Sequence, residues 1–269
     1  MYKKYRDSVE GVADTALSLV YPRRCPVCDE VMSPIEIRRR GGVKNNDLGK
    51  PDFDIHFGRL IHDECHRKIR YVRGATCMKC GKGLSESESD CEYCSDCRKV
   101  KHLFRQGFSV FEYRSMAGSV YKFKYLGRKE YADFYAAAAK RVLFPKIKRL
   151  GIEAVIPVPM YKEKENLRGY NQAQVLAKKV AAELGIPCYT NVIERRKNTT
   201  PMKELDTRGR RQNLKKAFNI TRNDVKFKCI LIIDDIYTTG STIDEITHEF
   251  QIAGVKDIYF LSLAIGQTT

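Results

Sequence analysis

The stretch from Cys229 to Thr242, with the sequence CILIIDDIYTTGST, constrains the fold of this chain more than any other. Ile230 to Ile233 form a continuous apolar run, which is typical of a strand buried on both faces of a parallel sheet. Asp234 and Asp235 follow at its carboxyl end, where open α/β sheets bind their ligands. We therefore expect a parallel sheet with a ligand site after this strand.

A loop of small hydroxyl residues around a glycine comes next and leads into an amphipathic helix. The loop consists of Thr238, Thr239, Gly240, Ser241 and Thr242. Such a turn can aim backbone N–H groups, hydroxyls and the positive end of a helix at one phosphate. The paired acids suit two vicinal hydroxyls, or a magnesium ion beside them. It is not a Walker A loop, because no Gly-Lys-Ser/Thr follows a spaced glycine. A sugar phosphate fits both halves of the stretch.

The stretch resembles the signature of type I phosphoribosyltransferases, which bind phosphoribosyl pyrophosphate (PRPP). In that family the acids hold the ribose hydroxyls and the Thr/Gly/Ser loop holds the 5′-phosphate. The resemblance therefore implies that Asp234 and Asp235 act at the ribose, that Thr238 to Thr242 bind the phosphate, and that Mg²⁺ is a cofactor. The alternative is an ordinary buried strand with an acidic turn.

Strands alternate with helices through the second half of the chain. Further strands are expected at Phe108–Phe111, Ala154–Pro159 and Ile258–Ile265, and helices near 130–143, ended by Pro145, and near 173–184. This alternation predicts an α/β fold with a doubly wound, mostly parallel sheet.

A second anion site is expected where the basic loop from Tyr161 to Gly169 meets the next helix. A pyrophosphate would fit there, with Arg168 as its cation, although a surface arginine beside a turn is the plainer explanation. Lys124 and the basic loop from Arg195 to Pro201 are expected to close over the site.

Eight of the ten cysteines fall between Cys25 and Cys97, mostly as pairs with a two-residue gap. That gap lets both side chains of a pair bind one ion, and two pairs complete the tetrahedron of a structural zinc. The sequence thus predicts two zinc sites. Site one comprises Cys25, Cys28, His62 and Cys65, and site two comprises Cys77, Cys80, Cys94 and Cys97.

Two alternatives stay open for these ligands. Cys91 can replace Cys97, because it has the same spacing from the cysteine between them. His56 and His66 compete with His62, which is preferred because it stands where a pair-forming cysteine would.

The formal net charge of +16 indicates either a well-solvated basic surface or attraction to the phosphates of nucleotides or nucleic acid. An arginine run at Arg38 to Arg40 lies in a polar insert from Ser33 to Leu60.

The chain has no run of about 18 apolar residues that could span a membrane, and its charged N-terminus lacks the apolar core of a signal peptide. We therefore expect a cytoplasmic protein with reduced thiols.

Together these features resemble the ComF family, especially ComFC, of bacterial phosphoribosyltransferase-like proteins associated with natural DNA uptake. The matching motifs are Cys25-Pro-Val-Cys28, Cys77-Met-Lys-Cys80-Gly81, Lys124-Tyr-Leu-Gly127, Pro157-Val-Pro159, Arg168-Gly-Tyr-Asn171-Gln172-Ala173, Arg210-x-x-Asn213-Leu-x-x-Ala217-Phe218 and Asp234-Asp235-x-x-Thr238-Thr239-Gly240-Ser241-Thr242. The chain departs from the family pattern at His62, where a cysteine is usual, in its long insert, and at Met202, where a glutamine is common.

The resemblance implies a role in competence, with partners among the competence proteins, a DNA-uptake helicase included. We expect an amphipathic helix over 1–20, a double zinc-ribbon module over 21–102 and a phosphoribosyltransferase-like domain over 103–269.

One hypothesis for the function is a Mg²⁺-dependent phosphoribosyltransferase that also contacts single-stranded DNA. The other is a non-catalytic DNA-binding or adaptor module on the same scaffold, because a fold does not establish turnover. No stacking platform for bases is evident in the sequence, although exposed tyrosines could add some stacking.

Overall fold

The computed structural model describes residues 22–32, 60–196, 217–221 and 226–266. The chain divides into two compact units, Met1–Lys68 and Ile69–Thr269. The sequence placed the boundary near residue 103, but the second cysteine group lies in the same unit as the sheet. The expected N-terminal helix, nearly all of the insert and the arginine run at 38–40 lie outside the described residues.

The described part of the first unit is a cysteine turn and one short helix. Arg24 and Val31 pair as an antiparallel bridge that closes the turn. Inside the turn Asp29 takes a left-handed conformation, with φ of 67°. The helix is α3 (Asp63–Arg67), and its buried residue is Cys65.

The second unit alternates helices and strands as the sequence predicts. Its elements are η2 (Glu86–Glu88), α4 (Ser95–Lys99), β1 (Gln106–Glu112), α5 (Tyr113–Tyr125), α6 (Tyr131–Ile147), η3 (Lys148–Leu150), β2 (Ala154–Pro157), α7 (Lys162–Arg168), α8 (Gln172–Leu184), β3 (Ile193–Arg195), β4 (Phe218–Ile220), β5 (Cys229–Tyr237), α10 (Ser241–Ile252) and β6 (Asp257–Ile265).

The main sheet has four strands in the order β1-β6-β5-β2, and all neighbours are parallel. The apolar strand β5 is an inner strand, as expected from its continuous hydrophobic run. β5 and β6 stay in register past the acids, with Asp234 opposite Ser262 and Tyr237 opposite Ile265. A separate antiparallel pair, β3 with β4, flanks residues 197–216, which lie outside the described part.

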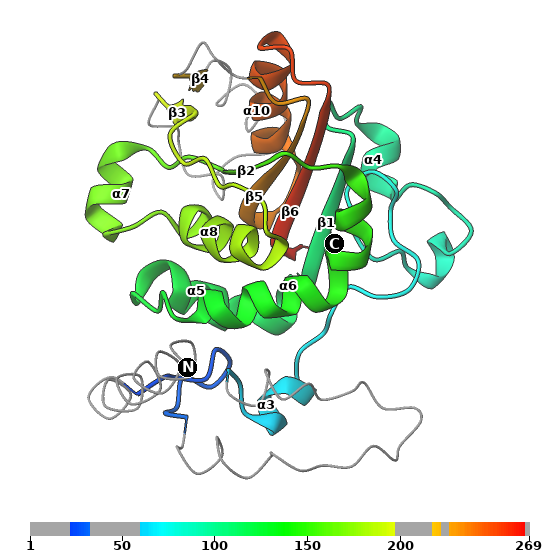
Figure 1. The fold of residues 1–269 in the computed structure, drawn as a ribbon. Helices are drawn as coiled ribbons and strands as arrows, with labels where there is room; N and C mark the ends of the chain where they lie inside the picture. Colours follow the sequence, from blue (N-terminus) through cyan, green and yellow to red (C-terminus); the bar gives the residue numbers. More distant parts are fainter. Residues whose placement is uncertain (1–21, 33–59, 197–216, 222–225, 267–269) are drawn as a thin grey trace, which may run out of the picture. The chain divides into compact units, whose positions relative to one another are not determined.

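Helices cover both faces of this sheet, with α5, α6 and α8 on one face and α10 on the other (Figure 1). Ile243, Ile246 and Phe250 of α10 are buried in one hydrophobic core with Ile230 and Ile232 of β5. Cysteines of the second group belong to the same core, which also contains Phe104 and Tyr237. The cysteine group is therefore built into the α/β unit.

Two local expectations are wrong. α6 does not end before Pro145 but continues to Ile147, because the proline is exposed while Leu143 and Ile147 on either side are buried. The segment expected as a basic loop is the helix α7, which ends at Arg168 and is followed by the C-cap residue Gly169, with φ of 83°. Within the described ranges, no helix is both long and apolar enough to cross a membrane.

Candidate functional site

Asp234 and Asp235 lie within β5, near the carboxyl end of the sheet. The strand continues beyond them to Tyr237, so the acids are fixed by sheet pairing and not by a loop. Oδ1 of Asp234 accepts a hydrogen bond from the backbone N–H of Asp235 at 2.8 Å. Both side chains are partly buried.

A lysine from α5 balances this pair of acids. Nζ of Lys124 lies 2.9 Å from Oδ1 of Asp235. Burial alone would lower the pKa of Lys124, but Asp235 and then Asp234 outweigh it, and the net shift is upward. Burial, together with the charge of Asp235, raises the pKa of Asp234 to about 7.

The loop after β5 presents the start of α10 without a cap. Gly240 is the N-cap residue, with φ of 76°, and no side-chain cap hydrogen bond forms there among the described residues. The hydroxyls of Thr239 and Ser241 lie 3.0 Å apart, and Thr238 is exposed. The N–H groups of the first turn, which have no intrahelical acceptor, therefore remain available to an anion.

The start of α8 differs, which weakens the expected second anion site. The side chain of Asn171 accepts hydrogen bonds from the N–H groups of Ala173 and Gln174 at 3.0 and 3.4 Å. Arg168 donates to Oε1 of Gln172 at 2.7 Å. The guanidinium of Arg168 could thus still bind a pyrophosphate. The N–H groups at the start of α8 could not, because Asn171 already caps them.

Arg168 also takes part in an exposed aromatic stack that sequence reasoning missed. The rings of Tyr121 and Tyr125 are 5.0 Å apart and tilted by 45°. The guanidinium of Arg168 lies 4.7 Å from the centroid of the Tyr125 ring. Tyr121 and Tyr125 are 57% and 52% exposed, so their rings can receive a planar ligand. The helical spacing of the tyrosines was visible in the sequence, but the arrival of Arg168 from α7 was not.

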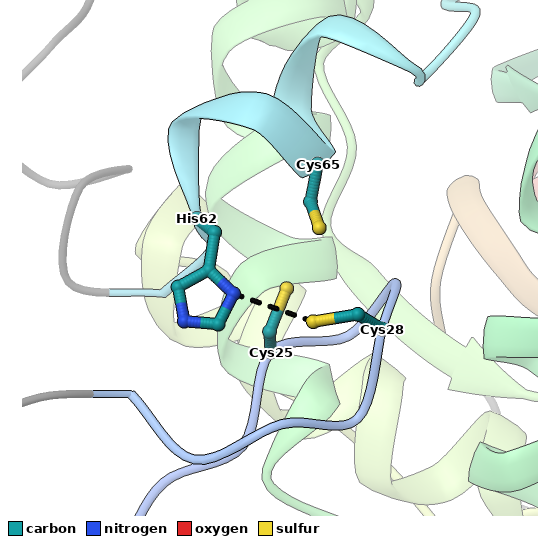
Figure 2. Close-up of side chains that lie close together, drawn as sticks. All are labelled: Cys25, Cys28, His62 and Cys65. Carbon is teal, nitrogen blue, oxygen red and sulfur yellow. Dashed lines mark hydrogen bonds between the residues drawn. The ribbon is translucent and has the colours of Figure 1, made fainter.

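In the first cysteine group the structure brings together Cys25, Cys28, His62 and Cys65 (Figure 2). Their candidate ligand atoms lie within 4.8 Å of one another. Sγ of Cys28 is 3.3 Å from Nδ1 of His62. His62 is thus the histidine placed with the three thiols. His66 is not in the group, and His56 lies outside the described residues.

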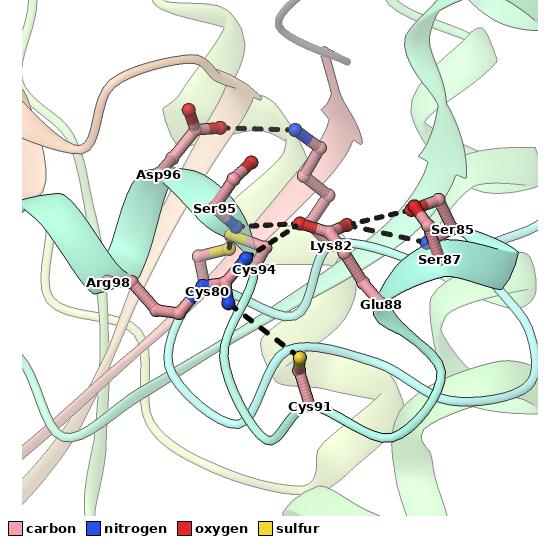
Figure 3. Close-up of polar contacts among 10 residues, drawn as sticks. All are labelled: Cys80, Lys82, Ser85, Ser87, Glu88, Cys91, Cys94, Ser95, Asp96 and Arg98. Carbon is pink, nitrogen blue, oxygen red and sulfur yellow. Dashed lines mark hydrogen bonds and ion pairs between the residues drawn. The ribbon is translucent and has the colours of Figure 1, made fainter.

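In the second group the structure brings together Cys77, Cys80, Cys94 and Cys97, within the same 4.8 Å. Sγ of Cys80 lies 3.7 Å from Sγ of Cys94. Cys91 instead lies against Arg98, whose Nη1 is 3.8 Å from its sulfur (Figure 3). The open choice between Cys91 and Cys97 is resolved geometrically in favour of Cys97.

Both donor sets fit a soft divalent ion. Three thiols with one imidazole, and four thiols, are the ligand sets of structural zinc. Burial and the neighbouring Cys25 raise the pKa of Cys65 to about 12, and a bound metal cation would lower it. Among the residues described, all the cysteines are free, and none forms a disulfide.

Comparison with known proteins agrees with this geometry. Residues 171–266 match the phosphoribosyl transferase domain family. The chain is 30% identical over 226 residues to Competence protein F of Haemophilus influenzae, a match that covers 77% of this chain and 96% of the relative. It belongs to the ComF/ComFC family. Competence protein ComFC of Bacillus subtilis is also 30% identical, over 73% of this chain and 77% of its own length.

Among solved structures, this chain is similar to a purine phosphoribosyltransferase from Pyrococcus horikoshii. The sequence identity is 20%, the TM-score is 0.33, and the match covers 49% of this chain and 74% of that one. The expectation of a competence-associated ComF/ComFC chain with a phosphoribosyltransferase-type domain is confirmed by the family match and by the parallel sheet.

Proposed function

We propose that this chain is a Mg²⁺-dependent phosphoribosyltransferase that uses PRPP. Asp234 and Asp235 hold the ribose hydroxyls, and Thr238 to Thr242 hold the 5′-phosphate. Arg168 and Lys124 receive the pyrophosphate, and Mg²⁺ supplies charge neutralisation beside the acids.

The observation that carries this proposal is the uncapped start of α10 directly after two acids at the carboxyl end of an inner parallel strand. Gly240 leaves the first-turn N–H groups open, whereas Asn171 closes those of α8 within the same unit. A sugar phosphate would satisfy the open helix start with its phosphate and the acid pair with its vicinal hydroxyls.

In the reaction, the bond between C1 of the ribose and the pyrophosphate oxygen breaks, and a bond from C1 to the acceptor's nucleophilic atom forms. The pyrophosphate leaves with the electron pair of the broken bond, and the proton lost by the acceptor passes to the solvent. The residues of this chain contribute position and electrostatics and form no covalent intermediate. The acid pair lies where positive charge develops on the ribose.

Pyrophosphate release tests this proposal. The metal-loaded full chain is incubated with PRPP, Mg²⁺ and a panel of candidate acceptors. Steady release that depends on one acceptor supports the enzyme. PRPP binding without turnover for any acceptor supports the adaptor alternative, in which the same pocket senses PRPP.

We further propose contact with single-stranded DNA, favoured by the exposed rings of Tyr121 and Tyr125 and by the net charge of +16. An open aromatic surface beside cations suits bases of a flexible strand, which stack without a pocket. The match to competence proteins supports this role, with other competence proteins, such as a DNA-uptake helicase, as partners. We place the chain in the cytoplasm with zinc in both cysteine groups, because reduced thiols are maintained there.

A further inference from the structure

The ring of His102 lies against the glycine of the candidate phosphate loop. A Cβ atom added at Gly240 would stand 2.8 Å from Cε1 of His102 and 2.5 Å from the hydroxyl of Tyr237. The side chain of His102 is only 3% exposed, and its ring stacks on that of Phe104 at 4.9 Å. The loop is therefore supported by packed aromatic rings.

Asp244, in the first turn of α10, fastens this ring in place. Its Oδ2 lies 2.8 Å from Nδ1 of His102, and its Oδ1 accepts the backbone N–H of Leu103 at 2.8 Å. Nε2 of His102 faces the hydroxyl of Tyr237 at 3.4 Å. Both carboxylate oxygens of Asp244 are thus engaged with residues 102–103.

The segment that carries His102 is also attached to the second cysteine group. Nζ of Lys79, between Cys77 and Cys80, donates to the backbone oxygen of Phe104 and lies 5.1 Å from the centroid of its ring. The N–H of Gly107 donates to the backbone oxygen of Lys79 at 2.7 Å. Residues 102–107 thus connect the cysteine group to the start of α10.

We infer that His102 and Asp244 are positioning residues for the 5′-phosphate. They hold Gly240 and the first turn of α10 so that the open N–H groups converge on one point, and they act through the backbone, without contact with the ligand. This inference rests on the proposed function, because it requires that the loop binds the phosphate of a sugar phosphate.

The test is calorimetry on the metal-loaded full chain with three probes: ribose 5-phosphate, PRPP with Mg²⁺, and pyrophosphate with Mg²⁺. His102→Ala and Asp244→Ala are each expected to weaken the binding of both sugar phosphates about tenfold. This is the effect of losing one charge-assisted hydrogen bond that orders the loop. Pyrophosphate, which lacks the 5′-phosphate, should bind as to the unmodified chain.

Two variants sharpen this experiment. Asp244→Asn is expected to retain most of the affinity, because its amide oxygen still accepts from Leu103 and its NH₂ group can donate to the other tautomer of His102. Glu183→Gln is the matched control, since it removes the exposed ion pair with Lys140 at the end of α8 and should change no affinity.

The outcomes separate the two proposals. A wild-type chain that binds neither sugar phosphate overturns the proposed function and this inference with it. A wild-type chain that binds them, with Asp244→Ala binding equally well, overturns this inference alone. If pyrophosphate binding weakens equally, the positioning role is also overturned, because a general loss of structure then explains the effect. Should Asp244→Ala not fold, Asp244→Ser, which is too short to reach His102, carries the same expectation.

Discussion

Nζ of Lys124 in α5 lies 2.9 Å from Oδ1 of Asp235 in β5, so an ion pair joins two elements across the candidate ribose site. Burial, and after it the charge of Asp235, raises the pKa of Asp234, while Lys124 lowers it, and the net shift is upward. We expect these two neighbouring acids to serve a ligand, because strongly perturbed carboxyl groups cluster at functional sites.

Asp234→Asn combined with Asp235→Asn is expected to abolish PRPP binding while the chain stays folded. The change removes both charges and half the acceptor capacity for ribose hydroxyls, with little change of volume. Calorimetry measures the affinity, and circular dichroism checks the fold. Unaltered PRPP affinity would rule out this placement of the ribose.

The contribution of Asp234 to the free energy of unfolding should fall as pH rises from about 4 to about 7. Across that interval the folded chain keeps a proton on Asp234, whose pKa is raised to about 7, while the unfolded chain has released it. Asp234→Asn should therefore raise the free energy of unfolding at pH 8, by an amount on the order of 2 kcal/mol, and much less at pH 4. Denaturant titrations of both chains at the two pH values measure this difference, and an equal difference at both would contradict it.

Gly240→Ala should destabilise the chain and remove ribose 5-phosphate binding. The new Cβ would meet Tyr237 and His102 closer than van der Waals contact, and the residue would keep a positive φ of 76°. We expect a loss of about 1–3 kcal/mol in the free energy of unfolding. Gly118→Ala in α5 is the control, because the added Cβ meets nothing within 4 Å, and alanine should stabilise a helix there by about 0.5–1 kcal/mol.

Metal analysis of protein purified without added zinc should give two zinc ions per chain, one for each cysteine group. Cys77→Ser is expected to lower the melting temperature of the α/β unit, because Cys77 lies in its hydrophobic core. Cys25→Ser belongs to the other unit and should leave that transition unchanged. One ion or none in folded protein would remove at least one of the two sites.

Single-stranded DNA should bind chiefly through phosphate contacts outside the PRPP pocket, so its affinity should fall steeply with salt, with a slope near −0.7 per phosphate neutralised. Tyr121→Ala with Tyr125→Ala should weaken binding about tenfold through lost stacking, while the paired Tyr→Phe control keeps both rings. Neutralising Arg38, Arg39 and Arg40 should also weaken DNA binding without changing PRPP affinity.

Oligonucleotide titrations at several salt concentrations, with and without saturating PRPP, measure these effects. Salt-independent binding, or full competition by PRPP, would place the DNA in the sugar-phosphate site instead.

The sequence by itself determined the features that depend on local spacing. The apolar run at Ile230 to Ile233 predicted an inner parallel strand. The two acids and the hydroxyl-rich loop after it predicted a helix whose N-terminus is open to a phosphate. The two-residue gaps predicted two groups of metal-binding side chains, and the preference for His62 and Cys97 within them agrees with the structure, which made the choice. These patterns are readable because the residues of each motif belong to one element or one tight turn.

Only the tertiary structure decided which remote residues meet. His102 and Asp244 are 142 positions apart, and no periodicity links them. Arg168, the last residue of α7, lies over the ring of Tyr125 in α5. The second cysteine group joins the sheet unit because its thiols share a hydrophobic core with α10. Such contacts depend on how whole elements pack, and packing is set by the summed burial of many side chains and not by the spacing of a few.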